Sequence, residues 1–140
     1  MRIIGLDLGT KTLGVAVSDA TCMISSAVKT IRFEENKPEL ALPELKEIIY
    51  EYNANLLVLG LPKNMNNSLG FAAQRSLDFK ELLEKELNIE VVLQDERLSS
   101  VTANNILLEA DISRKKRKTK VDTIAATIIL QNYLDIRKGR

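Results

Sequence analysis

The chain has 140 residues, of which 45% are hydrophobic and 28% are charged, a composition typical of one globular domain with a buried core. Its formal net charge of +1 excludes a global field as the reason for binding a polyanion, so any basic function must come from local clustering. The lack of histidine excludes Ser-His-Asp and Cys-His catalysis and histidine-ligated zinc, and one cysteine excludes a disulfide framework. No apolar run reaches membrane-spanning length and the N-terminus is not a signal peptide, so we expect a cytoplasmic protein.

The apolar pattern predicts strands and helices in an order that favours a mixed sheet. Strands are expected from β-branched and continuous apolar runs at residues 2–8, 14–18, 24–33, 56–62 and 89–96. Helices are expected from apolar residues at helical spacing at residues 38–53, 71–87, 101–110 and 121–134. The first two strands form a hairpin, and a polar, basic loop precedes the last helix. This order predicts one α/β domain over residues 1–140, with a mixed five-stranded sheet and helices on both faces.

Three acidic residues stand in apolar sequence rather than on a charged face. Asp7 lies inside the first strand, Glu96 ends the fifth and Asp122 opens the last helix. A carboxylate inside a strand is costly to bury unless it has a partner. Because side chains alternate along a strand, Asp95 and Glu96 are expected on opposite faces, so only one of them joins a given cluster.

Small residues near two of these acids allow the last helix to approach the first strand. Asp7 shares its strand face with Gly5 and Gly9, which leave room for a ligand or for a close helix. Asp122 precedes Ala126 by one helical turn, and that small side chain allows the helix to press against the sheet. The spacing therefore favours convergence of these acids.

Three carboxylates that meet must be neutralised by cations, because they repel one another. Oxygen-only ligands select Mg²⁺ or Mn²⁺, and two such ions about 3.5–4 Å apart form the clamp of phosphoryl-transfer nucleases. We therefore predict Asp7, Glu96 and Asp122 as catalytic and metal-binding residues. The alternative is a set of structural acids, in which Asp122 complements a helix N-terminus and Glu96 pairs with Arg97 or a lysine.

A basic run directly precedes Asp122. Residues 114–120 read RKKRKTK, with six basic residues in seven. The run fits either a solvated surface or a strip that contacts phosphates, and its place beside the acids favours the second reading. Aromatic residues make up only 4% of the chain, so base stacking has a minor part in recognition. The substrate-binding residues predicted here are Arg114, Lys115, Lys116 and Arg117.

Three further residues adjoin the acids. Thr10 and Lys11 follow the first strand and offer a hydroxyl, an ammonium and turn N–H groups to a phosphate. Arg97 follows Glu96 and either holds a phosphate or orients that acid. The alternatives are a plain hairpin turn and a surface ion pair that contributes little.

Four segments, in this order, resemble the sequence blocks of the YqgF family, also called RuvX. They read MRIIGLDLGTKTLGVAVSD, VLGLPKNMNNSLG, DERLSSVTA and KVDTIAATIILQNYLD, and together they span 1–135. The resemblance implies an RNase H-like fold and a nuclease that acts in 5′-end maturation of pre-16S ribosomal RNA, with structured RNA as its partner. It also implies that Asp7, Glu96 and Asp122 are the catalytic acids.

One loop departs from the family pattern. The family usually has NMDG there, whereas this chain has NMNN beginning at Asn64. Asn66 stands in place of a carboxylate, so this position cannot supply a charged ligand. We expect Asn66 instead to contact substrate or to fix the loop, and we predict that Asn64 of the same loop binds substrate.

Other functions fit parts of the same pattern. A Holliday junction resolvase would use the same chemistry on DNA, and a non-catalytic RNA-binding or transcription-associated factor would keep only the fold. An actin-like ATPase or sugar kinase also opens with a DxGT-type hairpin but needs two such domains, whereas 140 residues supply one. The complete set of three acids argues against lost catalysis.

Overall fold

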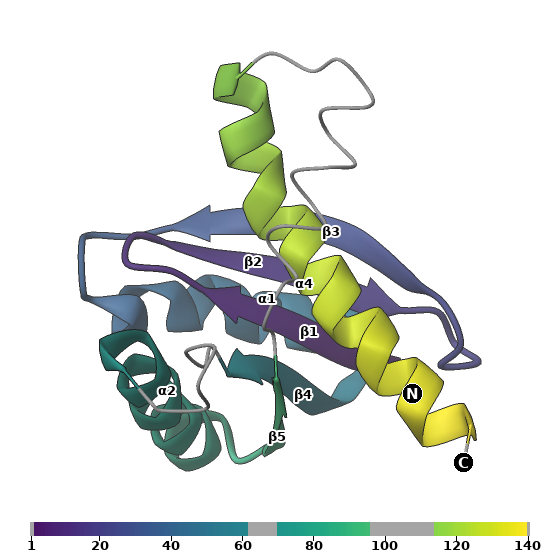
Figure 1. Ribbon diagram of the computed structural model, residues 1–140. Helices are drawn as coiled ribbons and strands as arrows, with labels where there is room; N and C mark the ends of the chain where they lie inside the picture. Colours follow the sequence, from purple (N-terminus) through teal and green to yellow (C-terminus); the bar gives the residue numbers. More distant parts are fainter. Residues whose placement is uncertain (1, 62–69, 96–113, 140) are drawn as a thin grey trace.

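The computed structural model describes residues 2–61, 70–95 and 114–139, which form a five-stranded sheet with helices on both faces (Figure 1). The expected mixed sheet and its two helical layers are confirmed. The strands are β1 (Arg2–Leu8), β2 (Thr12–Ser18), β3 (Ser25–Arg32), β4 (Ala54–Leu61) and β5 (Glu90–Asp95). The helices are the short 3₁₀ helix η1 (Pro38–Ala41), α1 (Leu42–Tyr52), α2 (Phe71–Leu87) and α4 (Arg114–Gly139).

The sheet has the strand order β3-β2-β1-β4-β5, so β1 lies at its centre. β1 pairs antiparallel with β2 and parallel with β4, and β4 pairs parallel with β5. The turn of the β1–β2 hairpin is closed by a hydrogen bond of 2.8 Å from the Gly9 N–H to the Thr12 carbonyl oxygen. A parallel connection needs a crossover, and α1 supplies the one that joins β3 to β4.

The two faces of the sheet carry separate cores. Alternate residues of β1, Ile4 and Leu6 among them, belong to the larger cluster, which also contains buried residues of α1 and α2. Ile3 belongs to the smaller cluster, which is made largely by α4. The two helical layers therefore bury opposite faces of the same strands.

Gly5 allows α4 to lie directly on β1. A β-carbon at position 5 would stand 2.6 Å from Leu130 Cβ and 3.0 Å from the Ala126 carbonyl oxygen. A β-carbon contact of 2.6 Å essentially never occurs in proteins, so a side chain fits there only if α4 shifts. Of the two expected uses of the space beside Gly5, a ligand or a close helix, the structure shows the helix, and the small side chain of Ala126 is buried at this contact.

Two helical segments differ from the sequence-based expectation. The segment 38–53 is divided into η1 and α1, because Pro43 in the first turn of α1 lacks the N–H that would continue a helix through it. The predicted basic loop is wrong for residues 114–120, which are helical and form the beginning of α4. Lys and Arg have helix propensities close to that of Ala, and repulsion costs only about 0.2–0.5 kcal/mol per neighbouring pair, so this run extends the helix.

Some predicted segments cannot be compared with the structure. The helix expected at 101–110 and nearly all of the loop at 63–70 lie outside the described residues. Within the described residues, no helix combines the length and the apolar composition that crossing a bilayer requires.

A network of hydrogen bonds at Asp19 shapes the turn between β2 and β3. The Asp19 carboxylate accepts a hydrogen bond from the Thr21 hydroxyl and two from the backbone N–H groups of Met23 and Ile24, at 2.8 and 3.1 Å. These bonds, the one from Thr21 above all, lower the pKa of the Asp19 carboxyl from 3.8 to about 2.

We predict that replacing Asp19 by Asn destabilises the protein at neutral pH, because the charged acceptor of three hydrogen bonds is lost. A lowered pKa contributes stability above the ordinary value of 3.8, and this contribution disappears as the pH falls toward 2. Urea unfolding midpoints of both proteins should therefore differ at pH 7 and converge toward pH 2. A difference that is independent of pH would contradict this role of the carboxylate.

We predict that Gly5→Ala lowers the free energy of unfolding by about 1–3 kcal/mol, because the added methyl group overlaps atoms of α4 that cannot rotate away. Gly9→Ala is the matched control, because its β-carbon would meet the Thr12 Oγ1 atom at 3.1 Å and that hydroxyl can rotate. The control should change stability by less than about 1 kcal/mol. If urea titrations gave equal losses of unfolding free energy for Gly5→Ala and Gly9→Ala, the close contact between α4 and β1 would not be the cause of the loss.

Candidate active site

Asp7 lies near the end of the central strand, on the face that α4 covers. Its neighbours Leu6 and Leu8 point into the larger core, so alternation places Asp7 on the same face as Ile3 and Gly5. The Asp7 side chain is half-buried rather than enclosed. A carboxylate is thus held at a fixed position while remaining accessible.

Glycines flank Asp7 on both neighbouring strands. Gly14 of β2 pairs directly with Asp7, and Leu6 pairs with Leu59 of β4, so Gly60 follows at the level of Asp7. Neither glycine carries a side chain that would cover the carboxylate. Sequence reasoning missed both residues, although a glycine inside an apolar strand often marks a close approach by a ligand or another backbone.

The position of Asp122 follows from the direction of α4. Gln131 of α4 accepts a hydrogen bond of 2.9 Å from the backbone N–H of Ser25, at the end of the sheet where β1 begins, whereas Ala126 lies against Gly5 further along β1. The helix therefore runs antiparallel to β1, as Figure 1 also shows. Since Asp122 precedes Ala126 by one turn, its helical position lies toward the end of β1 that carries Asp7.

Glu96 lies outside the described residues, directly after the last residue of β5. Within β5, Val92 packs against the cluster beneath α4, whereas Leu93 packs against the larger core. Gln94 pairs with Gly60 and thus lies in the same row across the sheet as Asp7. The described end of β5 therefore reaches the region of Asp7.

Thr10 and Lys11 lie in the β1–β2 turn, beyond Asp7, and both are exposed. Their carbonyl oxygens accept hydrogen bonds of 2.8 Å from the Asn36 N–H and 2.9 Å from the Phe33 N–H. The Lys11 ammonium lies 3.9 Å from a Glu35 carboxylate oxygen, and both side chains are well exposed, so the pair contributes little stability. The turn is anchored through its backbone, which leaves the Lys11 side chain accessible to solvent.

The remaining predicted site residues are described in part or not at all. Asn64 and Arg97 lie outside the described residues, and the predicted basic residues are described only as the helical backbone at the beginning of α4. Among the side chains that the structure describes, no three Asp, Glu, Cys or His residues form a group that could hold a metal ion. This finding does not test the three proposed acids as a set, because the side chains of Glu96 and Asp122 are not among the described ones.

Comparison with known proteins identifies the family. The family model described as "RuvX: Holliday junction resolvase" matches residues 1–136. The chain belongs to the RuvX family. A relative from Geobacillus sp. (strain WCH70), named "Putative pre-16S rRNA nuclease", is 50% identical to this RuvX chain over 138 residues, which are 99% of the chain and 100% of the relative. A relative of the same name from Listeria monocytogenes serotype 4b (strain CLIP80459) is 48% identical over 135 residues, covering 96% and 98% of the two chains.

Solved structures support the fold of this RuvX protein. RuvC of T. thermophilus in complex with a Holliday junction substrate superimposes with a TM-score of 0.60 at 15% identity, covering 99% of this chain and 97% of that one. This likeness confirms the RNase H-like fold that the sequence resemblance implied.

Proposed function

We propose that this protein is a metal-dependent endonuclease that hydrolyses phosphodiester bonds at the 5′ end of pre-16S ribosomal RNA in the cytoplasm, with one RNase H-like domain over residues 1–140. One observation carries the proposal: the chain matches, over 99% of its length and at 50% identity, a relative named "Putative pre-16S rRNA nuclease". The retention of Asp7, Glu96 and Asp122 in the sequence supports catalysis rather than binding alone.

The catalytic acids proposed are Asp7, Glu96 and Asp122. Asp7 is accessible between two glycines, and the helical position of Asp122 lies toward the same end of the sheet. Val92 packs beneath α4 and Leu93 packs in the larger core, and we propose that the same alternation, continued past the described end of β5, brings Glu96 to the face of Asp7. These three relations support convergence of the acids.

The donor set fits Mg²⁺ or Mn²⁺. The proposed ligands offer only carboxylate oxygens, the chain has no histidine, and Asp7 lies on a central strand between two glycines of the neighbouring strands. When bound, two such ions would activate water and stabilise charge on the scissile phosphate. Asp7, Glu96 and Asp122 would hold the ions and orient them toward the substrate.

Substrate binding is assigned to basic and polar residues around the acids. Lys11 and Thr10 extend from the end of the strand that carries Asp7, and the exposed Lys11 ammonium can contact a phosphate. α4 begins with the basic run, which ends two residues before Asp122. Structured RNA is favoured over DNA junctions because of the relatives' names. The substrate-binding residues proposed are Thr10, Lys11, Asn64, Arg97, Arg114, Lys115, Lys116 and Arg117.

We predict that the protein cleaves structured pre-16S RNA in the presence of Mg²⁺ or Mn²⁺ and that Asp7→Asn abolishes this cleavage. An amide is a poorer ligand than a carboxylate and removes one charge. Single-stranded RNA and four-way DNA junctions should be tested in parallel. Preferred cleavage of the junction would instead assign the protein to DNA resolution, and an inactive wild-type protein with full RNA affinity would make it a binding factor.

Thermal melts separate the catalytic role of Asp7 from a structural one. Without metal, Asp7→Asn should leave the protein as stable or more stable, because repulsion among the acids falls. With Mg²⁺, the rise in melting temperature should shrink, because that rise measures binding to the native state. Asp78→Asn, an exposed change on α2, is the control and should keep the full metal response. Loss of about 3–5 kcal/mol in metal-free Asp7→Asn, with an unchanged metal response, would contradict the assignment.

We predict that replacing Arg114, Lys115, Lys116 and Arg117 with Gln weakens RNA binding and flattens its salt dependence, because fewer counterions are released. Gln is used because these positions are helical and it retains helix propensity. The control replaces four basic residues of α1 and α2 with Gln, which removes the same charge elsewhere. This control should leave the salt dependence of RNA binding unchanged. Its positions are Lys46, Arg75, Lys80 and Lys85. Equal effects of the two sets on RNA affinity at several salt concentrations would show that only net charge matters.

A further inference from the structure

The helices on the two faces of the sheet carry opposite net charges. α4 contains eight basic and two acidic residues, whereas η1, α1 and α2 together contain four basic and eight acidic residues. α4 packs on one face and α1 and α2 on the other (Figure 1). The net charges of +6 and −4 attract a polyanion to the α4 side and repel it from the α1–α2 side. The acidic side is therefore unsuited to RNA and suited to a basic ligand.

An exposed ridge on α1 is the central feature of the acidic side. The ridge consists of the exposed residues Pro43, Lys46, Glu47, Tyr50 and Glu51. The Tyr50 side chain is 89% exposed, so it contributes almost nothing to the core. Tyrosine supplies a large contact area with few rotatable bonds, and it is enriched where protein surfaces meet.

A groove lies between this ridge and the end of α2. Its volume is about 730 Å³, which is enough to accept several side chains of a partner. Apolar atoms of Ile49, Tyr50 and Leu87 line it. Glu47 and Glu86 add two carboxylates and Lys46 adds one ammonium, so the charge of the lining is net negative. An apolar floor with acidic residues beside it is complementary to a segment that carries both apolar and basic side chains.

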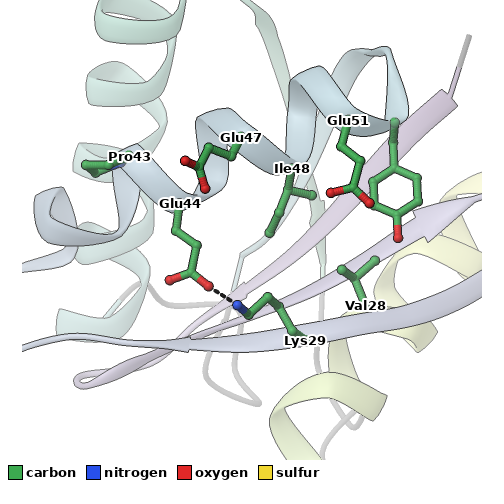
Figure 2. Close-up of a pocket in the computed structure, with 8 residues that line it drawn as sticks. Val28, Lys29, Pro43, Glu44, Glu47, Ile48 and Glu51 are labelled. Carbon is green, nitrogen blue, oxygen red and sulfur yellow. Dashed lines mark ion pairs between the residues drawn. The ribbon is translucent and has the colours of Figure 1, made fainter.

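A second, smaller groove of about 430 Å³ flanks the other side of the ridge, between α1 and β3 (Figure 2). Three glutamates of α1 line it, and Lys29 of β3 forms an ion pair with one of them, Glu44. Among the described residues, Glu47 and Glu51 have no basic partner within ion-pair distance. The two carboxylates beside Tyr50 are thus available to an incoming cation.

We infer that the α1 ridge and the groove between α1 and α2 form a docking surface for a basic, amphipathic helical segment of a protein partner. Its apolar side chains would enter the groove beside Tyr50, and its Lys or Arg residues would face Glu47, Glu51 and Glu86. The surface lies on the face of the sheet opposite α4, so a bound partner leaves Asp7 and the basic helix accessible. Partner binding and RNA binding are therefore compatible on one molecule.

Synthetic peptides test the chemistry of the occupant. Fluorescence anisotropy would compare an amphipathic Lys/Leu helical peptide, a Lys/Ser peptide of equal charge and length, and a Glu/Leu peptide, each with the full chain. The Lys/Leu peptide should bind best, the Lys/Ser peptide at least about tenfold more weakly because it lacks apolar contacts, and the Glu/Leu peptide not at all. Equal binding of the first two peptides would overturn the proposed role of the groove.

Matched variants test the place of binding. Tyr50→Ala and Glu86→Lys should each weaken binding of the Lys/Leu peptide by about tenfold or more. The controls are Ile136→Ala, an exposed apolar residue on α4, and Glu81→Lys, an exposed residue of α2 that does not line the groove. Thermal melts of Tyr50→Ala should match wild type, since the side chain is 89% exposed.

Two results would overturn the inference. In one, Tyr50→Ala and Glu86→Lys affect peptide binding no more than their controls. In the other, sedimentation shows a dimer that Tyr50→Ala dissociates, which would make a second copy of the chain the occupant. RNA cleavage does not enter this test, so it stands independently of the proposed nuclease activity.

Discussion

The close contact between Gly5 and α4 is the constraint on which the proposed site depends. At 2.6 Å from Leu130 Cβ, no side chain fits at position 5, and the helix therefore rests on the backbone of β1. The contact sets the height of α4 over the sheet, and together with the hydrogen bond from Ser25 to Gln131 it defines the direction of the helix. Because the helix is rigid and runs antiparallel to β1, Ala126 at this contact also determines where the preceding turn, with Asp122, lies.

The separation of two cores explains how an acid is tolerated inside the central strand. The larger cluster of buried side chains lies on the face of α1 and α2, where β1 contributes Ile4 and Leu6. Asp7 is on the opposite face, where it is half-buried. Gly14 of β2 lies beside it on one side, and Gly60 of β4 lies beside it on the other. The carboxylate thus avoids the full cost of burial, while the strand that carries it remains fixed by the larger core.

The two helical layers carry opposite net charges, and each charge suits one of the two proposed binding partners, RNA and a basic protein segment. The net charge of +6 on α4 favours approach of a polyanion on the side of Asp7, and the net charge of −4 on η1, α1 and α2 disfavours it on the other. The same acidic layer, with Tyr50 exposed beside an apolar groove, is suited to a basic protein segment. Opposite faces of the same sheet can therefore bind different partners.

Local sequence pattern determined the strands, the helix at 71–87 and the face of Asp7, because alternation and helical spacing are properties of neighbouring residues. It also identified Gly5 as a place for a close helix and the three acids of the RuvX motifs. It did not predict that the basic run belongs to α4, since a polar run without apolar residues at helical spacing gives no periodic signal, although Lys and Arg have high helix propensity. The glycines beside Asp7 became visible only in the tertiary structure, because strand pairing joins Gly14, Asp7 and Gly60 from distant parts of the chain.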